Sequence, residues 1–398
     1  MPDAAPQPLA AGYRALLLDC DGVLYLGDQV IQPAPTALGA ARALGCRLAF
    51  ITNNSRTSPV AVAAKLTGMG IEAEAGEVFT SAQAVVRLLG PERVAGAKVL
   101  MLGGPGLRDT LTEAGAELVD PGDWRKADLV VVGLDTELTY AKAAAAALAI
   151  GAGARFAATN ADFSLPSPDG PMPGAGSILA LLTATTGRRP EVAGKPEPAL
   201  FELVAAAAGP GPHLVVGDRE DTDLAGATRL GWDTALVLTG ITTRADLCEL
   251  PDQPTWMLRD LDGLLGPRPP VVRAAGGDEP AAAGRLLAGA GADASRADGA
   301  AVAVTGEGTL AGAVGWSTSG EGEGELFGPV VEPEARGSLA GTRLVMAACA
   351  ALRAAGARRV LADGPQGFLG PLGFAPAGGR MARDLGDLAA AGAGQEPQ

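Results

Sequence analysis

The most constraining feature of this chain is a short aliphatic run that ends in two acidic residues. Residues 15–24 read Ala-Leu-Leu-Leu-Asp-Cys-Asp-Gly-Val-Leu, and a run this short and aliphatic predicts a buried strand. Because open α/β sheets bind ligands at the carboxyl ends of their strands, we expect Asp19 and Asp21 at such an edge. Two carboxylates at this spacing can serve as nucleophile and as general acid and base. An EF-hand calcium loop is the alternative, but Gly22 comes too early for its register.

Apolar strands alternate with Ala/Leu-rich helical stretches over most of the chain. The alternation runs from residue 14 to about residue 265 and is typical of a parallel α/β sheet. Ser58 and Pro59 supply the N-cap and first residue of one such helix. A proline-rich stretch at 267–272 predicts a domain boundary. Beyond it, the Gly/Glu-rich stretch 317–325 predicts a loop.

Composition and charge exclude several classes of protein. The 398 residues carry a formal net charge of −14, which argues against nucleic acid and anionic membrane surfaces as partners. The N-terminus has no basic segment followed by an apolar one, and no apolar stretch is long enough to span a bilayer. We therefore expect a cytoplasmic protein.

The four cysteines are scattered without any Cys-x-x-Cys spacing. Neither a zinc site nor a disulfide framework is indicated, so we expect Cys20, Cys46, Cys248 and Cys349 to be reduced core residues.

The single histidine limits the possible chemistry further. His213 precedes an apolar stretch, Leu-Val-Val, which favours a structural histidine at a strand end. Ser-His-Asp triads, Cys-His pairs and His-ligated zinc hydrolases are then disfavoured. Carboxylates, lysine and a hard metal ion remain as the means of catalysis.

Three further segments supply such groups. The strand predicted at 48–51 runs into Thr52-Asn53-Asn54-Ser55, whose side chains and backbone amides suit phosphoryl oxygens. Lys195 lies among prolines, of which Pro198 can open a helix. A strand ending at Gly217 is followed by three acidic residues that could offer oxygen ligands to magnesium, namely Asp218, Asp221 and Asp223. Taken singly, each segment is also typical of an ordinary polar turn.

In this order, the four segments resemble the signature motifs of the haloacid dehalogenase superfamily, phosphotransferases that form an aspartyl-phosphate. The match spans about residues 14–265. The resemblance implies that Asp19 is the nucleophile and Asp21 the acid and base. Thr52 would donate a hydrogen bond to the phosphoryl group, and Lys195 would restrain Asp19 and the transferring group. The residues implied to bind the substrate's phosphoryl group are Gly22, Thr52, Asn53, Asn54 and Lys195.

The same resemblance implies a magnesium ion. It would be held by Asp19, the backbone carbonyl of Asp21, and Asp218, with Asp223 supporting it through water or through its ligands. Asp221 is the alternative for that supporting role. The physical logic is independent of the family: a phosphate monoester dianion repels a carboxylate nucleophile, so a cation and a lysine must neutralise both.

Spacing locates an inserted domain. The stretch between Asp19 and Thr52 is too short for a domain, whereas the stretch from Thr52 to Lys195 far exceeds one strand–helix unit. Within it, four segments resemble the NagD-like branch of the superfamily, whose cap is an α/β domain; they are residues 131–136, 158–162, 173–177 and 186–188. The predicted fold is α/β, a Rossmann-like core of residues 1–80 and 187–266 with a cap of residues 81–186.

From about residue 272 the sequence resembles a GNAT acetyltransferase, which implies an α+β domain over residues 272–390. In that family, a loop rich in arginine and glycine holds the pyrophosphate of coenzyme A at a helix N-terminus. Arg336, Gly337 and Gly341 fit this role and make coenzyme A a candidate partner.

Two positions depart from the acetyltransferase pattern. Leu339 stands where a second glycine is usual, and Leu369 stands where a tyrosine general acid is usual. Residues 272–398 contain no tyrosine. A regulatory or vestigial domain is therefore favoured over an active acetyltransferase; a stabilising appendage is the simplest alternative.

The combination of a NagD-like phosphatase and a GNAT-like domain is similar to the glycerol 3-phosphate phosphatases of the actinobacterial type. We expect a magnesium-dependent phosphomonoester hydrolase that acts on a small phosphorylated metabolite, with glycerol 3-phosphate as the leading substrate. Phosphoglycolate or another small phosphate ester is the alternative, as is a bifunctional phosphatase that binds acyl-coenzyme A. The oligomeric state stays open, a homo-oligomer included.

Overall fold

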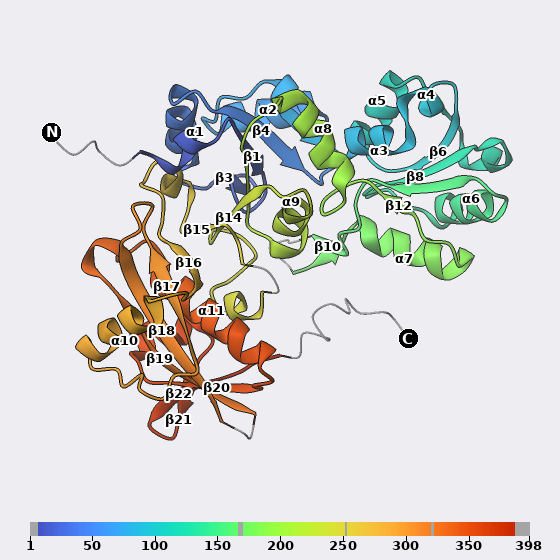
Figure 1. The fold of residues 1–398 in the computed structure, drawn as a ribbon. Coiled ribbons are helices and arrows are strands. Elements are labelled where there is room, and N and C mark those ends of the chain that lie inside the picture. Colours follow the sequence, from blue (N-terminus) through green and yellow to red (C-terminus); the bar gives the residue numbers. More distant parts are fainter. Residues whose placement is uncertain (1–6, 166–169, 251–252, 320–321, 387–398) are drawn as a thin grey trace. The chain divides into compact units, whose positions relative to one another are not determined.

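The computed structural model describes residues 7–165, 170–250, 253–319 and 322–386 (Figure 1). Internal packing divides the chain into two compact units. One holds residues 11–217 and 221–234; the other holds residues 218–220 and 235 onward, with the first residues up to Ala10. This division does not address the border between core and cap, so the bounds of the three expected domains stay predictions. None of the helices in the described ranges is long and apolar enough to cross a bilayer.

A six-stranded sheet contains the predicted strand with its acidic end. In sheet order, the strands are β15 (Trp256–Leu258), β14 (Asp233–Val237), β13 (His213–Gly217), β1 (Ala15–Asp19), β4 (Arg47–Thr52) and β5 (Val78–Thr80). β1 is buried along its whole length and pairs in parallel with both β13 and β4. The carboxyl ends of these three strands therefore lie side by side, which is where such sheets bind ligands.

The helices around this sheet are α1 (Ala34–Ala43), α2 (Pro59–Gly68), α8 (Pro198–Ala208) and α9 (Ala225–Arg229), and a short pair of strands, β2 (Tyr25–Leu26) and β3 (Gln29–Val30), follows β1. Two of these helices, α2 and α8, begin where the sequence predicts. The Ser58 hydroxyl accepts a hydrogen bond from the Ala61 amide at 3.3 Å, which confirms the predicted N-cap. Pro198 is the first residue of α8, as its fixed φ favours.

A second, five-stranded parallel sheet lies within the long insertion. Its order is β12 (Glu191–Val192), β9 (Arg155–Ala158), β8 (Leu129–Val132), β6 (Lys98–Leu102) and β7 (Glu117–Leu118). The same stretch contains α3 (Ser81–Leu89), α4 (Pro91–Val94), α5 (Pro105–Glu113), α6 (Tyr140–Gly151), α7 (Ala175–Thr186) and the hairpin of β10 (Ser164–Leu165) and β11 (Met172–Pro173). One apolar cluster includes Leu17 and Ile51 of the first sheet, Val85 of α3, and Val99 and Val131 of the second. The two sheets thus share a core.

A seven-stranded sheet forms the C-terminal part of the fold. Its order is β16 (Val271–Ala274), β17 (Gly299–Val304), β18 (Leu310–Ser319), β19 (Glu323–Val331), β20 (Arg359–Ala362), β22 (Arg380–Asp384) and β21 (Ala375–Ala377). Only β19 and β20 pair in parallel; the other pairs are antiparallel. The helices α10 (Glu279–Gly289) and α11 (Ala340–Ala354) pack against this sheet, and the short α12 (Gln366–Leu369) follows β20 (Figure 1).

Shorter helical turns complete the chain. Those of the 3₁₀ type span Leu9–Gly12, Ala75–Glu77, Pro121–Lys126, Asp246–Glu249, Leu261–Leu264, Pro333–Ala335 and Gly370–Leu372, and a π-helical turn spans Glu220–Leu224.

The predicted loop at 317–325 is wrong for its described residues. Ser317 pairs with Glu325, and Ser319 with Glu323, across an antiparallel hairpin of β18 and β19. The stretch is rich in Gly, Ser and Glu, which strands usually avoid, but cross-strand pairing at the end of a long hairpin overrides that weak preference.

The expectations for cysteine and histidine are confirmed. All four cysteines are buried and free. The His213 ring lies against Trp232, with ring centroids 5.0 Å apart, and its Nε2 lies 3.0 Å from the Gly209 carbonyl oxygen. This is a structural role at the start of β13.

A group of arginines holds residues 246–250 and 253–270 against the C-terminal helix and sheet. Glu249 accepts hydrogen bonds from Arg353 of α11 at 2.5 Å and from Arg383 of β22 at 2.8 Å. Arg343 of α11 donates to the carbonyl oxygens of Pro254 and Pro270, both at 3.3 Å. Burial lowers the pKa of Arg343 to about 10. Three nearly buried guanidinium groups thus depend on acceptors from this segment.

Glu249→Gln should destabilise the protein strongly, because it removes the only carboxylate that pairs with Arg353 and Arg383 within the described residues. We expect a loss of about 3 kcal/mol, the lower end of the range for breaking a buried pair, since the Glu249 side chain is 34% exposed. Urea unfolding of the full chain measures it. The control is Glu323→Gln, in the exposed pair with Arg359, which should cost less than about 1 kcal/mol. Equal losses for both variants would contradict the role of Glu249.

Candidate active site

Lys195 is the centre of the site at the carboxyl edge of the first sheet. Its Nζ donates hydrogen bonds to Asp19 Oδ1 at 2.5 Å and to Asp223 Oδ1 at 2.6 Å. The side chain is only 4% exposed. Burial alone would lower the pKa of Lys195, but the two carboxylates outweigh it and hold that pKa above its ordinary value. The lysine is therefore a fixed positive charge.

Three buried carboxylates gather around this lysine. One oxygen each from Asp19, Asp218 and Asp223 lies within 4.8 Å of the others. Asp19 ends β1, and Asp218 directly follows β13. Asp223 lies in the π-helical turn and is fully buried, whereas Asp221 in the same turn is exposed. All the donors are hard oxygens, which fits Mg²⁺, and one ammonium cannot neutralise three carboxylates.

Asp21 lies two residues beyond Asp19 and has a different environment. Its side chain is exposed at the surface, yet partial desolvation raises its pKa, against the lowering effect of Lys65 and Lys195. Gly22 follows with a positive φ of 81°, and its amide donates to the Tyr25 carbonyl oxygen at 2.9 Å. This turn separates two carboxylates that are close in sequence, and it leaves Asp21 with a pKa above its ordinary value.

Three polar residues at the end of β4 and directly after it have different partners. The Thr52 hydroxyl is buried and accepts from the Asn54 amide at 3.1 Å. The Asn54 side chain is used locally, where its Oδ1 accepts from the Arg56 amide at 2.9 Å. Asn53 instead reaches Lys195: its Oδ1 accepts from the Lys195 amide at 2.8 Å, and its Nδ2 donates to the Lys195 carbonyl oxygen at 3.1 Å. Sequence reasoning missed this clamp, since only the fold brings the two segments together.

The clamp extends into the insertion. Asn53 Nδ2 also donates to Asp162 Oδ2 at 3.1 Å, and Asn160 Nδ2 donates to the same oxygen at 2.7 Å. A Cβ on Gly194 would lie 2.5 Å from Asn53 Oδ1 and 2.5 Å from the Thr159 carbonyl oxygen. Glycine is therefore required where the two segments meet. The motif around residues 158–162 pointed to the NagD-like branch, but not to this contact.

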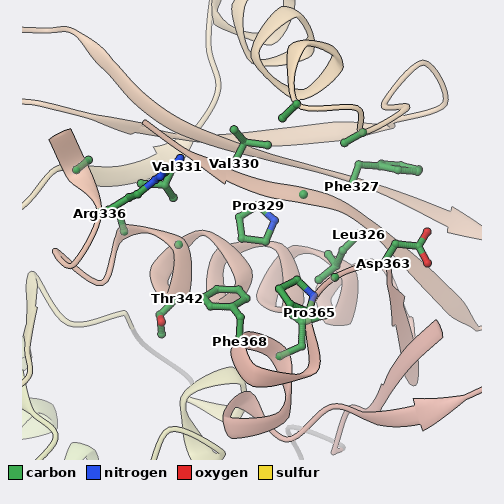
Figure 2. A pocket seen from close by; sticks show the side chains of 18 of the residues that line it. Leu326, Phe327, Pro329, Val330, Val331, Arg336, Thr342, Asp363, Pro365 and Phe368 are labelled. Atoms are coloured by element: carbon green, nitrogen blue, oxygen red, sulfur yellow. The ribbon is translucent and has the colours of Figure 1, made fainter. Parts of the chain in front are cut away.

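The C-terminal unit brings together the residues expected to bind coenzyme A. A cavity of about 870 Å³ lies beside β19 and the start of α11 (Figure 2). The residues that line it include Arg336, Gly337 and Gly341. Leu339 precedes α11 with a φ of 61°, a left-handed conformation that glycine adopts more easily. A leucine thus occupies a left-handed backbone position at the start of α11. Leu369, at the position expected for a proton donor, is buried.

Comparisons with known families agree with this arrangement. The family of haloacid dehalogenase-like hydrolases matches residues 16–117, a HAD-hydrolase-like family matches residues 192–264, and the GNAT acetyltransferase family matches residues 273–367. An acid sugar phosphatase of Staphylococcus haemolyticus is 39% identical over 252 residues, which are 63% of this chain and 94% of that protein.

Solved structures extend the similarity. The glycerol phosphate phosphatase of Mycobacterium tuberculosis in complex with magnesium has a TM-score of 0.71 and 31% identity, covering 91% of this chain and 97% of that one. A thermostable NPPase of Geobacillus stearothermophilus has a TM-score of 0.58 and 36% identity, covering 63% of this chain and 97% of that one. The chain therefore belongs to the haloacid dehalogenase-like hydrolases, as a phosphatase of the NagD-like branch that carries a GNAT acetyltransferase domain at its C-terminal end.

Proposed function

We propose that this protein is a magnesium-dependent phosphomonoester hydrolase that acts on glycerol 3-phosphate through an aspartyl-phosphate. The observation that carries the proposal is the Lys195 ammonium held between Asp19 and Asp223 within a group of three buried carboxylates. The substrate rests on similarity over 91% of the chain, GNAT domain included, to a glycerol phosphate phosphatase. The acid sugar phosphatase matches only 63% of the chain. Phosphoglycolate or another small phosphate ester is the second candidate.

The roles proposed for the chain's residues follow from their surroundings. Asp19 attacks the phosphorus atom, while Lys195 neutralises charge on Asp19 and on the phosphoryl oxygens. Asp21, with its raised pKa, donates a proton to the leaving alkoxide and then removes one from the attacking water. Mg²⁺, held by Asp19, the Asp21 carbonyl oxygen and Asp218, would supply the remaining charge neutralisation. Asp223 supports the site by fixing Lys195.

The phosphoryl-binding residues fall into two groups. Thr52 is proposed to donate its hydroxyl proton to a phosphoryl oxygen. Gly22 and Asn54 are proposed to lie against the same group, while their own backbone amides donate to the Tyr25 carbonyl oxygen and to the Thr52 hydroxyl oxygen. Asn53 was expected in the same group, but its side chain already makes three hydrogen bonds within the protein. We assign it as a positioning residue for Lys195.

A substrate panel tests the proposal. With Mg²⁺ present, kcat/KM should be at least about tenfold higher for glycerol 3-phosphate than for phosphoglycolate, sugar phosphates or nitrophenyl phosphate. Asp19→Asn is the control and should abolish turnover of every ester, because an amide is neither a competent nucleophile nor an anionic ligand. A different preferred ester would overturn the substrate, and turnover by Asp19→Asn would overturn the mechanism.

Metal dependence gives a separate prediction. Chelation should stop hydrolysis reversibly, Mg²⁺ should restore it, and Ca²⁺ should restore it poorly because calcium accepts a looser geometry. Asp218→Asn should raise the Mg²⁺ concentration for half-maximal rate at least about tenfold. Asp221→Asn, an exposed neighbour outside the buried group, should change it less than about twofold. Full activity after exhaustive chelation would contradict the metal assignment.

The Asn53 clamp predicts a positioning effect. Asn53→Ala frees the Lys195 backbone, and kcat should fall by about 10²-fold, as for a small misplacement of a catalytic group. Asp162→Ala should lower kcat less, and Asp162→Asn should recover most of that loss, because its Oδ1 still accepts from Asn53. If Asn53→Ala raised KM with kcat unchanged, Asn53 would be a substrate-binding residue as first expected.

A further inference from the structure

The turn that carries Asp21 is held by the backbone of Tyr25. Asp21 and Tyr25 form a β-bridge, and the Gly22 amide donates to the Tyr25 carbonyl oxygen at 2.9 Å. The Tyr25 amide in turn donates to the Cys20 carbonyl oxygen at 3.3 Å. The Asp21 carboxylate itself makes no hydrogen bond or ion pair with any residue that the structure describes. The place of this proposed acid and base is therefore set by its backbone, and that backbone is held by Tyr25.

The Tyr25 side chain contacts a lysine from another part of the chain. Its ring is buried, and the Lys65 ammonium of α2 lies 3.9 Å from the ring centroid, which is the geometry of a cation–π contact. Lys65 Nζ also donates a hydrogen bond to the Gly27 carbonyl oxygen at 2.8 Å. Tyr25 begins β2, and Gly27 lies in the turn between β2 and β3. One ammonium thus holds the hairpin at its first strand and at its turn.

A third neighbour of this lysine contributes little. Asp28 Oδ1 lies 3.7 Å from Lys65 Nζ, but the Asp28 side chain is fully exposed. Ion pairs this exposed are weak, so the ring and the carbonyl oxygen are the main partners of the ammonium. Asp28 offers a matched control, because a change at Asp28 leaves both of these contacts in place.

Lys65 links two segments that both carry site residues. α2 follows β4 and the polar residues 52–55, whereas the hairpin of β2 and β3 follows β1 and Asp21. β1 and β4 pair in parallel only as far as Asp19, so this pairing ends before Asp21. The contact between Lys65 and Tyr25 connects the two segments beyond the end of the strands.

We propose that Lys65 is a positioning residue for Asp21, and that it acts through the ring of Tyr25 and the carbonyl oxygen of Gly27. The inference rests on the proposed function in one respect, the role of Asp21 as acid and base; the part in which Lys65 fixes the turn after β1 does not. As the bond from Asp19 to phosphorus forms and the ester P–O bond breaks, the proton of Asp21 passes to the leaving oxygen. A displaced Asp21 slows this step, but an ester whose leaving group needs no proton is spared.

Kinetics with two esters test the positioning role. Lys65→Met should lower kcat/KM at least about fivefold for glycerol 3-phosphate, or for the alkyl ester that the substrate panel favours, as for a small misplacement of a catalytic group. For nitrophenyl phosphate, whose phenolate leaves without a proton, the change should be less than about twofold. Lys65→Arg keeps a cation over the ring and should recover most of the loss, and Asp28→Asn should match the parent. An equal loss for both esters, or no loss for either, overturns the role.

Tyr25→Leu separates position from charge. It removes the ring but keeps the positive charge of Lys65, so it should show the same selective loss for the alkyl ester. Unchanged kcat/KM in Tyr25→Leu would overturn the route through Tyr25.

Hydrogen exchange on the full chain tests the fixed turn without any substrate. Lys65→Met should speed exchange of the amides of residues 22–25 at least about fivefold, whereas Asp28→Asn should leave it unchanged. Unchanged exchange in Lys65→Met overturns the inference. Asp21→Asn tests the proposed function separately, because it should lower kcat/KM for the alkyl ester far more than for nitrophenyl phosphate. If Asp21→Asn lowers both equally while Lys65→Met still speeds exchange, the proposed role of Asp21 is overturned and the fixed turn stands.

Discussion

The Lys195 ammonium is the charge on which the rest of the active site depends. A buried ammonium is costly unless it is paired and hydrogen-bonded, and its two carboxylate partners come from different parts of the chain: Asp19 ends β1, and Asp223 follows β13. The pairing therefore requires both strands in their observed register. One ammonium carries a single positive charge against three buried carboxylates, and the hard oxygen donors of this group fit a divalent cation.

Asn53 connects this charge to the inserted sheet. Its side-chain amide holds the Lys195 backbone from both sides and meets Asp162 from the loop after β9. The position of the lysine is thus set jointly by the first sheet and by the insertion. The insertion shares an apolar core with the first sheet, and its Asp162 contacts the same amide that holds the Lys195 backbone. The insertion therefore helps to position this lysine.

The outline of the fold and the core of the site could be predicted from sequence because their signals are local. Aliphatic runs, a serine–proline helix start and acidic residues after strands indicate β1, α2 and the carboxyl edge of the sheet. Three other features depend on contacts between distant segments. The clamp by Asn53, the pairing of Ser317 with Glu325 and the contact of Glu249 with Arg353 and Arg383 have no signature in their own neighbourhood, and composition misleads at 317–325.

The arginines that contact Glu249, Pro254 and Pro270 have a consequence for how such a chain can evolve. Arg343 and Arg353 lie in the acetyltransferase match, while Pro254 and Glu249, which they contact, lie in the hydrolase match. The boundary between the two family matches in the sequence is thus not the boundary between the two compact units, because residues 235–264 of the hydrolase match belong to the same unit as the acetyltransferase match. Recombination at the proline-rich join would separate buried cations from their acceptors, so homologues that carry both parts should accumulate changes on either side of this contact in concert.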